Sequence, residues 1–253
     1  MPMGTLLIKL AGPMQSWGAE SRYTERKTRH EPTKSGIVGL LASALGRRRE
    51  ELVDDLACLR MAVRIDQFGK FGRDFQTAHT RKFDKLRQSW VFDKSLPLSN
   101  RYYLLDAVFV AGIEMPDDLL DTFASALLHP AFPLYLGRRS CPPATKVLLD
   151  TREGVSLMEA LTAQPWEASN RRLLKECKGK PFISCEVLRD CLSPEDELRG
   201  GEPVRDYPVS FSQIDRQYEW RTVIHDTVQA PNPHYVGGNL SLSHDPISAL
   251  EEV

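Results

Sequence analysis

The loop of residues 12–18 carries polar and aromatic groups that suit contact with an unpaired nucleic-acid base. It follows an apolar segment and presents the amide of Gln15, the hydroxyl of Ser16 and the indole of Trp17 between two glycines. Such groups hydrogen-bond to the edges of a base or stack on its face. The alternative is a structural turn in which Trp17 belongs to the core.

A second candidate is the segment PTKSG at residues 32–36, which precedes the clearest helical pattern in the chain. The hydroxyls of Thr33 and Ser35, the ammonium of Lys34 and the free N–H groups of a helix start would attract a phosphate. The G-x-x-x-x-G-K-[ST] spacing of an ATP-binding loop is missing, so ATP binding is not predicted. Capping of the helix by Thr33 or Ser35 is the alternative, and it is compatible with a phosphate contact.

Basic side chains are the remaining candidates for contact with nucleic acid. Residues 21–49 hold eight bases and two acids, and residues 70–94 hold seven bases, three acids and five interleaved aromatic residues. A solvated charged face is the plainer interpretation, but two such segments beside one predicted sheet favour nucleic-acid binding. Residues 137–143, GRRSCPP, add two adjacent arginines suited to clamping phosphate, or simply a surface turn. The contacts predicted from these stretches are Arg22, Arg26, Arg81, Lys82, Arg87, Trp90, Arg138 and Arg139.

The chain of 253 residues has a net charge of −1, which on its own argues against an anionic partner. The charge is unevenly distributed, because residues 1–105 carry +8 and residues 106–253 carry −9. This asymmetry predicts a basic working surface joined to an acidic remainder that faces protein neighbours or solvent.

The order of predicted elements indicates an α+β protein. Strands are expected over residues 5–11, 61–66, 102–113 and 132–136, with helices over 37–45, 49–59 and 117–127. This order predicts a ferredoxin-like or RRM-like βαββαβ domain over residues 1–145. Residues 67–100 show no regular period and are predicted to form a long irregular insertion between the second and third strands. Residues 146–253 are predicted to form a smaller, mainly β region, with strands over 181–188 and 219–229, a helical turn over 157–161 and a loop over 203–208.

Other classes of protein are excluded by what the sequence lacks. No apolar run is long enough for a signal peptide or a membrane span, so a cytoplasmic protein is expected. The five cysteines are odd in number and form no C-x-x-C pair, and the six histidines show no ligand spacing, so no metal and no cofactor are expected. A metal-independent nuclease needs only an acid–base pair, for which His79 and Tyr23 are candidates.

Several segments, in order, resemble the CasD family, the subunit of the type I-E CRISPR Cascade complex that holds the 5′ end of the guide RNA. They are LAGPMQSWG (residues 10–18), Ser21-Arg22, PTKSGIVGLLASALG (32–46), RYYLLDAVF (101–109) and YLGRRSCPP (135–143). The resemblance covers about the first 145 residues. It implies an RRM-like domain of the RAMP group in which residues 67–100 form a thumb, reaching along the guide RNA (crRNA) to the adjacent backbone subunit. It also implies that the 5′ handle is bound by Gln15, Ser16, Trp17, Lys34, Ser35, Arg138 and Arg139.

We therefore predict a non-catalytic crRNA-binding subunit of Cascade in antiviral defence. Its partners would be the guide RNA, the backbone and large subunits and, through the assembled complex, target DNA. One alternative is a metal-independent endoribonuclease that processes the CRISPR repeat RNA. A general RNA-binding module outside defence is the other.

Overall fold

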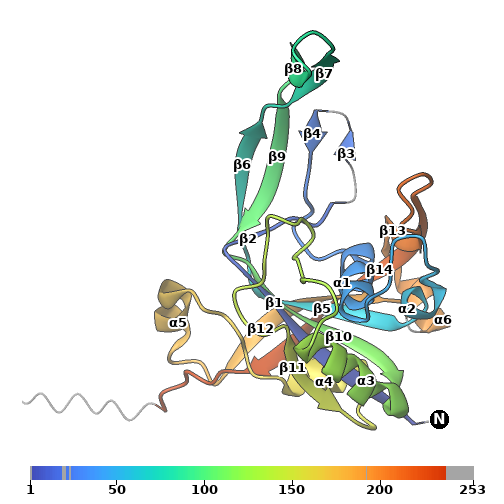
Figure 1. The fold of residues 1–253 in the computed structure, drawn as a ribbon. Coiled ribbons are helices and arrows are strands. Elements are labelled where there is room, and N and C mark those ends of the chain that lie inside the picture. The colour runs from blue at the N-terminus through green and yellow to red at the C-terminus, as the bar shows by residue number, and fades with distance from the viewer. Residues whose placement is uncertain (1, 19–20, 23, 192, 238–253) are drawn as a thin grey trace, which may run out of the picture.

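A computed structural model describes residues 2–18, 21–22, 24–191 and 193–237, which form a body with a long β arm (Figure 1). The body is built on a seven-stranded sheet in which every neighbouring pair of strands is antiparallel. In sheet order its strands are β11 (Leu148–Arg152), β1 (Met3–Ala11), β10 (Val108–Pro116), β5 (Arg60–Gln67), β12 (Phe182–Asp190), β14 (Gln217–Pro231) and β13 (Glu202–Ser210).

The central strands are buried on both faces of this sheet. In β1, Leu6, Ile8 and Leu10 belong to one hydrophobic core, whereas Leu7 belongs to a second core together with Val110 of β10. Alternate side chains of a strand point to opposite faces, so a strand covered on both sides reads as a continuous apolar run. This is why residues 5–11 are mainly apolar, although Lys9 interrupts the run and pairs with Glu167.

Helices cover the two faces. The helices are α1 (Lys34–Ala44), α2 (Asp54–Ala57), α3 (Asp117–Leu128), α4 (Leu157–Ala163), α5 (Arg171–Cys177) and α6 (Pro194–Arg199). Residues of α1 and α3 pack in the first core, and residues of α4 pack in the second. None of the helices within the described residues is long and apolar enough to cross a membrane.

The helix predicted over residues 37–45 is confirmed as α1. The hydroxyl of Thr33 accepts a hydrogen bond from the backbone N–H of Gly36 at 3.2 Å, and Gly46 follows the helix with a φ of +79°. These are the cap and the left-handed stop expected there. The helix at residues 117–127 is also confirmed, whereas only four residues of the one predicted over 49–59 are helical.

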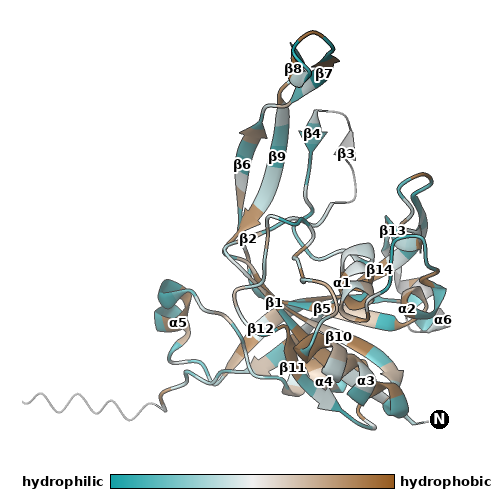
Figure 2. Ribbon diagram, in the orientation of Figure 1, coloured by the Kyte–Doolittle hydropathy of each residue, from teal (hydrophilic) through white to brown (hydrophobic). Residues whose placement is uncertain are grey.

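The prediction of an irregular segment at residues 67–100 is wrong, because it forms most of the β arm. The strands of the arm are β2 (Met14–Gln15), β3 (Ser21–Arg22), β4 (Glu25–Arg26), β6 (Lys70–Gln76), β7 (His79–Asp84), β8 (Ser89–Ser95) and β9 (Ser99–Leu105). β6 pairs with β9, and β7 pairs with β8 at the tip. The arm projects from the body, so β6, β7 and β8 have no buried face, and hydrophobic and hydrophilic residues are interspersed along it (Figures 1 and 2). The two-residue alternation that identifies a half-buried strand is therefore missing.

Three further element predictions are corrected. Residues 102–113 contain parts of two strands in different sheets, β9 and β10, separated at Asp106, whose φ is +54°. Residues 132–136 form no strand, and the edge partner of β1 is β11. Residues 203–208, predicted as a loop, lie within β13. β13 is at the edge of the sheet, where prolines are tolerated because no neighbour requires their missing N–H.

The C-terminal strands extend the sheet that the first half of the chain begins. β12 pairs with β5, β14 pairs with β12, and β13 pairs with β14. The predicted boundary at residue 145 therefore falls between strands of one continuous sheet. The α+β class is confirmed.

Candidate nucleic-acid interface

The side chains of Gln15 and Trp17 face inward. The Nε2 of Gln15 donates to the carbonyls of Leu10 at 3.1 Å and Ala107 at 2.8 Å, and its Oε1 accepts from the indole Nε1 of Trp17 at 3.0 Å. Both side chains are buried, and the Trp17 ring lies against Gly36, where an added Cβ would come within 2.7 Å of it. The amide and the indole therefore fix the loop of residues 12–18 against the first core and the start of α1.

The loop of residues 135–139 packs directly on this loop. The backbone N–H of Ser16 donates to the carbonyl of Leu136 at 3.0 Å. Gly137 has a φ of +87°, and a Cβ on it would lie 1.8 Å from the carbonyl oxygen of Ser16. Only glycine fits both the backbone conformation and the close approach. Two segments about 120 residues apart in the sequence thus form one surface.

Arg138 ties this surface to the root of the arm. Its guanidinium donates to the carbonyls of Tyr102 at 3.1 Å and Arg26 at 2.7 Å and lies 4.9 Å from the centre of the Tyr103 ring. These partners are uncharged, so the positive charge of Arg138 is held in place without being neutralised.

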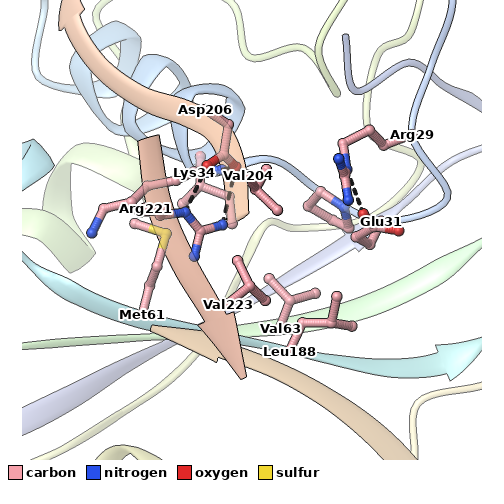
Figure 3. A pocket seen from close by; sticks show the side chains of 12 residues that line it. Arg29, Glu31, Lys34, Met61, Val63, Leu188, Val204, Asp206, Arg221 and Val223 are labelled. Atoms are coloured by element: carbon pink, nitrogen blue, oxygen red, sulfur yellow. Dashed lines mark hydrogen bonds and ion pairs between the residues drawn. The ribbon is translucent and has the colours of Figure 1, made fainter. Parts of the chain in front are cut away.

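Lys34 belongs to a buried cluster of four charged side chains, which we call the buried tetrad: Lys34, Asp190, Asp206 and Arg221. The ammonium of Lys34 donates to Asp190 at 2.8 Å, and the backbone N–H of Lys34 donates to Asp206 at 2.7 Å. Arg221 bridges the two carboxylates, with 2.6 Å contacts to each. In Figure 3, Arg221, Asp206 and Lys34 converge at the start of α1. The sequence predicted a phosphate at the start of α1. In the structure the carboxylate of Asp206 accepts the hydrogen bond from the backbone N–H of Lys34 there.

A groove of about 580 Å³ opens where these motifs meet, and we call it the arginine groove. Among the residues that the structure describes, six arginines and no acidic residue line it: Arg26, Arg47, Arg48, Arg49, Arg138 and Arg216. Ser35, Gly36, Gly39 and Ser43 of α1 add a small-residue surface, and Tyr135, Phe211 and Tyr218 add aromatic rings. Guanidinium groups beside aromatic rings can bind phosphates and stack bases, so the groove has the chemistry of a nucleic-acid site.

Comparison with known proteins identifies the family. A family model described as CRISPR-associated protein (Cas_Cas5) matches residues 5–224. The chain belongs to this Cas5 family. The Cascade subunit CasD of Escherichia coli (strain K12) is 31% identical over 167 residues, which cover 62% of this chain and 75% of that protein. The resemblance seen in the sequence is confirmed.

Solved structures agree with this assignment. A crystal structure of a Cas protein is 36% identical with a TM-score of 0.63, and the match covers 92% of this chain and 98% of that one. A chain of a CRISPR RNA-guided surveillance complex is 27% identical with a TM-score of 0.70, and the match covers 98% of this chain and 100% of that one. The fold is therefore shared along nearly the whole of this Cas5-family chain.

The groove unites some of the residues predicted as RNA contacts and leaves others outside. Those that line it are Ser16, Trp17, Arg26, Thr33, Ser35 and Arg138. Gln15 and Lys34 are buried away from it, and Arg139 is exposed outside it. The side chain of Arg22 lies outside the described part of the structure.

The four arm residues lie on the distal hairpin, apart from the groove. Arg81 and Lys82 are on β7, Trp90 is on β8, and Arg87 is in the turn between these strands. All four are exposed. Lys82 pairs with Asp93 of the same hairpin.

Several lining residues are not among the contacts predicted from the sequence. Arg47, Arg48 and Arg49 follow the end of α1 and belong to the basic stretch of residues 21–49, but they were not predicted as individual contacts. Phe211, Arg216 and Tyr218 come from the β13–β14 hairpin, and only the tertiary fold brings them to α1.

Most of the groove's positive charge is free of internal ion pairs. Among the described residues, Arg47 is the only one of the six that forms an ion pair, with Asp55. The hydrogen bond from Arg47 lowers the pKa of the Asp55 carboxyl below its ordinary value. Five guanidinium groups are therefore available to an anionic ligand.

The acidic half of this Cas5-family chain neutralises bases elsewhere. Glu167 pairs with Lys9 at 2.7 Å, Glu202 pairs with Arg29 at 2.9 Å, and Asp190 pairs with Lys34. In each pair the base comes from residues 1–105 and the acid from residues 106–253. Some of the excess acids of residues 106–253 therefore form ion pairs that connect this part of the chain to residues 1–105.

His79, one of the two acid–base candidates, does not line the groove. His79 lies on the arm, with its Nδ1 3.2 Å from the hydroxyl of Ser95 and its ring edge-on to Phe92. Tyr23 is outside the described residues. Within the described part of the chain, no three His, Cys, Asp or Glu side chains come together in a group that could hold a metal ion.

Proposed function

We propose that this chain is a non-catalytic crRNA-binding subunit of a CRISPR Cascade surveillance complex, and that the arginine groove holds the 5′ handle of the guide RNA. The groove itself carries this proposal, because six arginines, and no acid from the described part of the chain, converge there from separate segments. Guanidinium groups form strong charge-assisted hydrogen bonds to phosphate, and the aromatic lining offers surfaces on which bases stack. The similarity to a Cascade subunit and to a chain of an RNA-guided surveillance complex supports the same assignment.

We assign two different roles to the residues that the sequence predicted as RNA contacts: positioning of the loops, and direct contact with RNA. Gln15, Trp17 and Lys34 have internal partners, so we assign them to positioning the loops that border the groove. Direct contacts are assigned to exposed or partly exposed groups at the groove: Arg26, Ser35, Arg48, Arg49, Arg138 and Arg216.

We further propose that the body contains a ferredoxin-like core and that the arm is a thumb. The sheet order β11-β1-β10-β5, with α1 between β1 and β5 and α3 between β10 and β11, supports a βαββαβ arrangement. Four strands of the arm, β6 to β9, lie between the second and third strands of this core, β5 and β10. Its exposed tip, with Arg81, Lys82, Arg87 and Trp90, would contact the guide RNA and the adjacent backbone subunit. The large subunit and target DNA would be met in the assembled complex, in the cytoplasm.

The test compares two double variants of the full chain. The groove variant Arg48→Gln/Arg216→Gln removes two lining charges. The control variant Arg60→Gln/Lys146→Gln removes two exposed charges outside the groove. Fluorescence anisotropy with a labelled repeat-derived handle RNA is expected to show about tenfold weaker binding for the groove variant only. The slope of log K against log salt should fall by about 1.4, because each phosphate contact on a single strand contributes about 0.7.

Equal binding by the two variants would overturn the assignment of the groove. Incubating the unmodified protein with repeat RNA in EDTA tests the non-catalytic role, since cleavage at one position would identify a metal-independent endoribonuclease. Equal affinity for handle and scrambled RNA would favour a general RNA-binding module.

A further inference from the structure

The helix α5 and the turn that follows it form a concentrated basic surface within the acidic half of the chain. Residues 171–180 contain five bases and one acid, Glu176, although residues 106–253 as a whole carry −9. All five basic side chains are exposed: Arg171, Arg172, Lys175, Lys178 and Lys180. We call this surface the α5 patch.

The α5 patch is held on a fixed base beside the root of the arm. The backbone N–H groups of Ser169 and Asn170 donate to the Oε1 of Gln67 at 3.0 and 2.8 Å, and Asn170 caps α5 with its side chain. Leu173 and Leu174, on the inner side of α5, pack against the second core. The positive charges are thus presented outward from a helix fixed at its start and along one face.

The patch is distinct from the arginine groove. None of its residues lines the groove, and α5 and α1 lie on opposite sides of the root of the arm in the view of Figure 1. A ligand on the α5 patch would therefore not compete directly for the groove.

The helix dipole favours Lys175 in the last turn of α5, but it does not account for the bases at the start of the helix. Arg171 and Arg172 lie in the first turn of α5, where the helix dipole disfavours cations, and no acid occupies that turn. Within the described residues, Arg172 is the only patch base with an ion pair, to Glu176 at 2.8 Å. Four unpaired charges held close together repel one another, and an external polyanion would relieve that repulsion.

We propose that the α5 patch binds the phosphate backbone of a nucleic-acid duplex without reading its sequence. Residues 169–180 contain no aromatic side chain, whereas the arm interleaves aromatic residues with its bases. A duplex keeps its bases stacked inside and offers phosphates outside, so it needs cations rather than stacking surfaces. Phe182 and Tyr235 are exposed in neighbouring segments, which makes single-stranded RNA the competing ligand to be tested.

The experiment uses the full chain and a 30-base-pair DNA duplex of arbitrary sequence. The patch variant Lys175→Gln/Lys178→Gln is compared with the control Arg60→Gln/Lys146→Gln, which loses the same charge elsewhere. We expect the patch variant alone to bind the duplex about tenfold more weakly at low salt. Its slope of log K against log salt should fall by about 1.8, since each phosphate contact on duplex DNA contributes about 0.9. Glu176→Gln, which removes the only acid of the patch, is expected to bind the duplex more tightly than the unmodified chain.

Two outcomes would overturn the inference. One is equal duplex binding by the patch and control variants. The other is a loss confined to a single-stranded RNA of the same length. Measuring the handle RNA on the same proteins separates this inference from the proposed function. The groove variant should lose handle binding and keep duplex binding, and the patch variant should do the reverse.

Discussion

Asp206 on β13 accepts a hydrogen bond at 2.7 Å from the backbone N–H of Lys34, the first residue of α1. A carboxylate from the last quarter of the chain therefore accepts a hydrogen bond from a free backbone N–H at the start of α1, near the N-terminus of the chain. The same carboxylate binds Arg221, which also reaches Asp190, the partner of the Lys34 ammonium. The buried tetrad locks the C-terminal strands against α1, and that contact brings the β13–β14 hairpin to the groove.

Replacing Lys34 by methionine is expected to destabilise the fold rather than to remove an RNA contact. The Lys34 side chain is buried, and its loss leaves Asp190 short of one charged partner. Breaking a buried ion pair typically lowers the free energy of unfolding by about 3 kcal/mol. Urea denaturation of Lys34→Met beside Lys146→Met measures this loss. The slope of log K against log salt for RNA binding should not change. A smaller slope in a variant of unchanged stability would show that Lys34 contacts the RNA.

Gly137→Ala is expected to disrupt the wall of the groove. Alanine at a φ of +87° costs about 1–2 kcal/mol, and its Cβ would also collide with the carbonyl of Ser16. Gly154→Ala is the matched control, because Gly154 has a φ of +63° with nothing within 4 Å of the added Cβ. The difference in unfolding free energy between the two variants isolates the collision. Equal unfolding free energies for the two variants would show that the loop of residues 135–139 does not contact the loop of residues 12–18.

Much of the body could be predicted from the sequence because its signals are local. The period of α1, the cap at Thr33 and the stop at Gly46 all lie within one short segment. The apolar runs of β1 and β5 identify strands without any knowledge of their neighbours.

The arm and the groove could not be predicted in the same way. β6 has no buried face, so Phe71 and Phe75 give no alternating pattern, and the prolines of β13 suggest a loop unless the strand is known to be at an edge. Arg216 reaches the groove only because β13 and β14 pack beside α1, a contact about 180 residues apart in the sequence. The loops of residues 12–18 and 137–143 both contribute to the lining of the groove, but the sequence does not show which of their side chains point into the core.

His225 is expected to make the stability of the chain depend on pH. A hydrogen bond to Glu186, and a further contact with Glu202, raise the pKa of His225 above its ordinary value of 6.5. The imidazolium therefore stabilises the folded state fully below pH 6.5, and this contribution is lost as the pH rises through the folded-state pKa. The effect is small because the His225 side chain is 46% exposed.

Urea denaturation at pH 5.5 and pH 8.5 tests this dependence. The unmodified chain should lose more stability between the two values than His225→Gln, and NMR titration should show a lower His225 pKa in Glu186→Gln. An identical pH profile for the unmodified chain and His225→Gln would contradict the assignment.

The cysteines are expected to differ sharply in reactivity. Burial raises the pKa of Cys185 to about 12 and also raises the pKa of Cys141, so both thiols stay protonated and covered at neutral pH. Cys58 is exposed. Iodoacetamide followed by mass spectrometry should label Cys58 in the native chain and the two buried thiols only after unfolding. Labelling of Cys185 in the native state would contradict the packing of the second core.

The pairing of β12 with β5 also bears on how the chain folds while it is being synthesised. β5 ends at Gln67, and β12 begins at Phe182, more than 100 residues later. At about 5–20 residues per second, a ribosome leaves one edge of β5 without its partner for several seconds. An unpaired strand edge is a template for pairing with another chain. The nascent chain must therefore avoid pairing with other chains through this edge until β12, β13 and β14 have been synthesised.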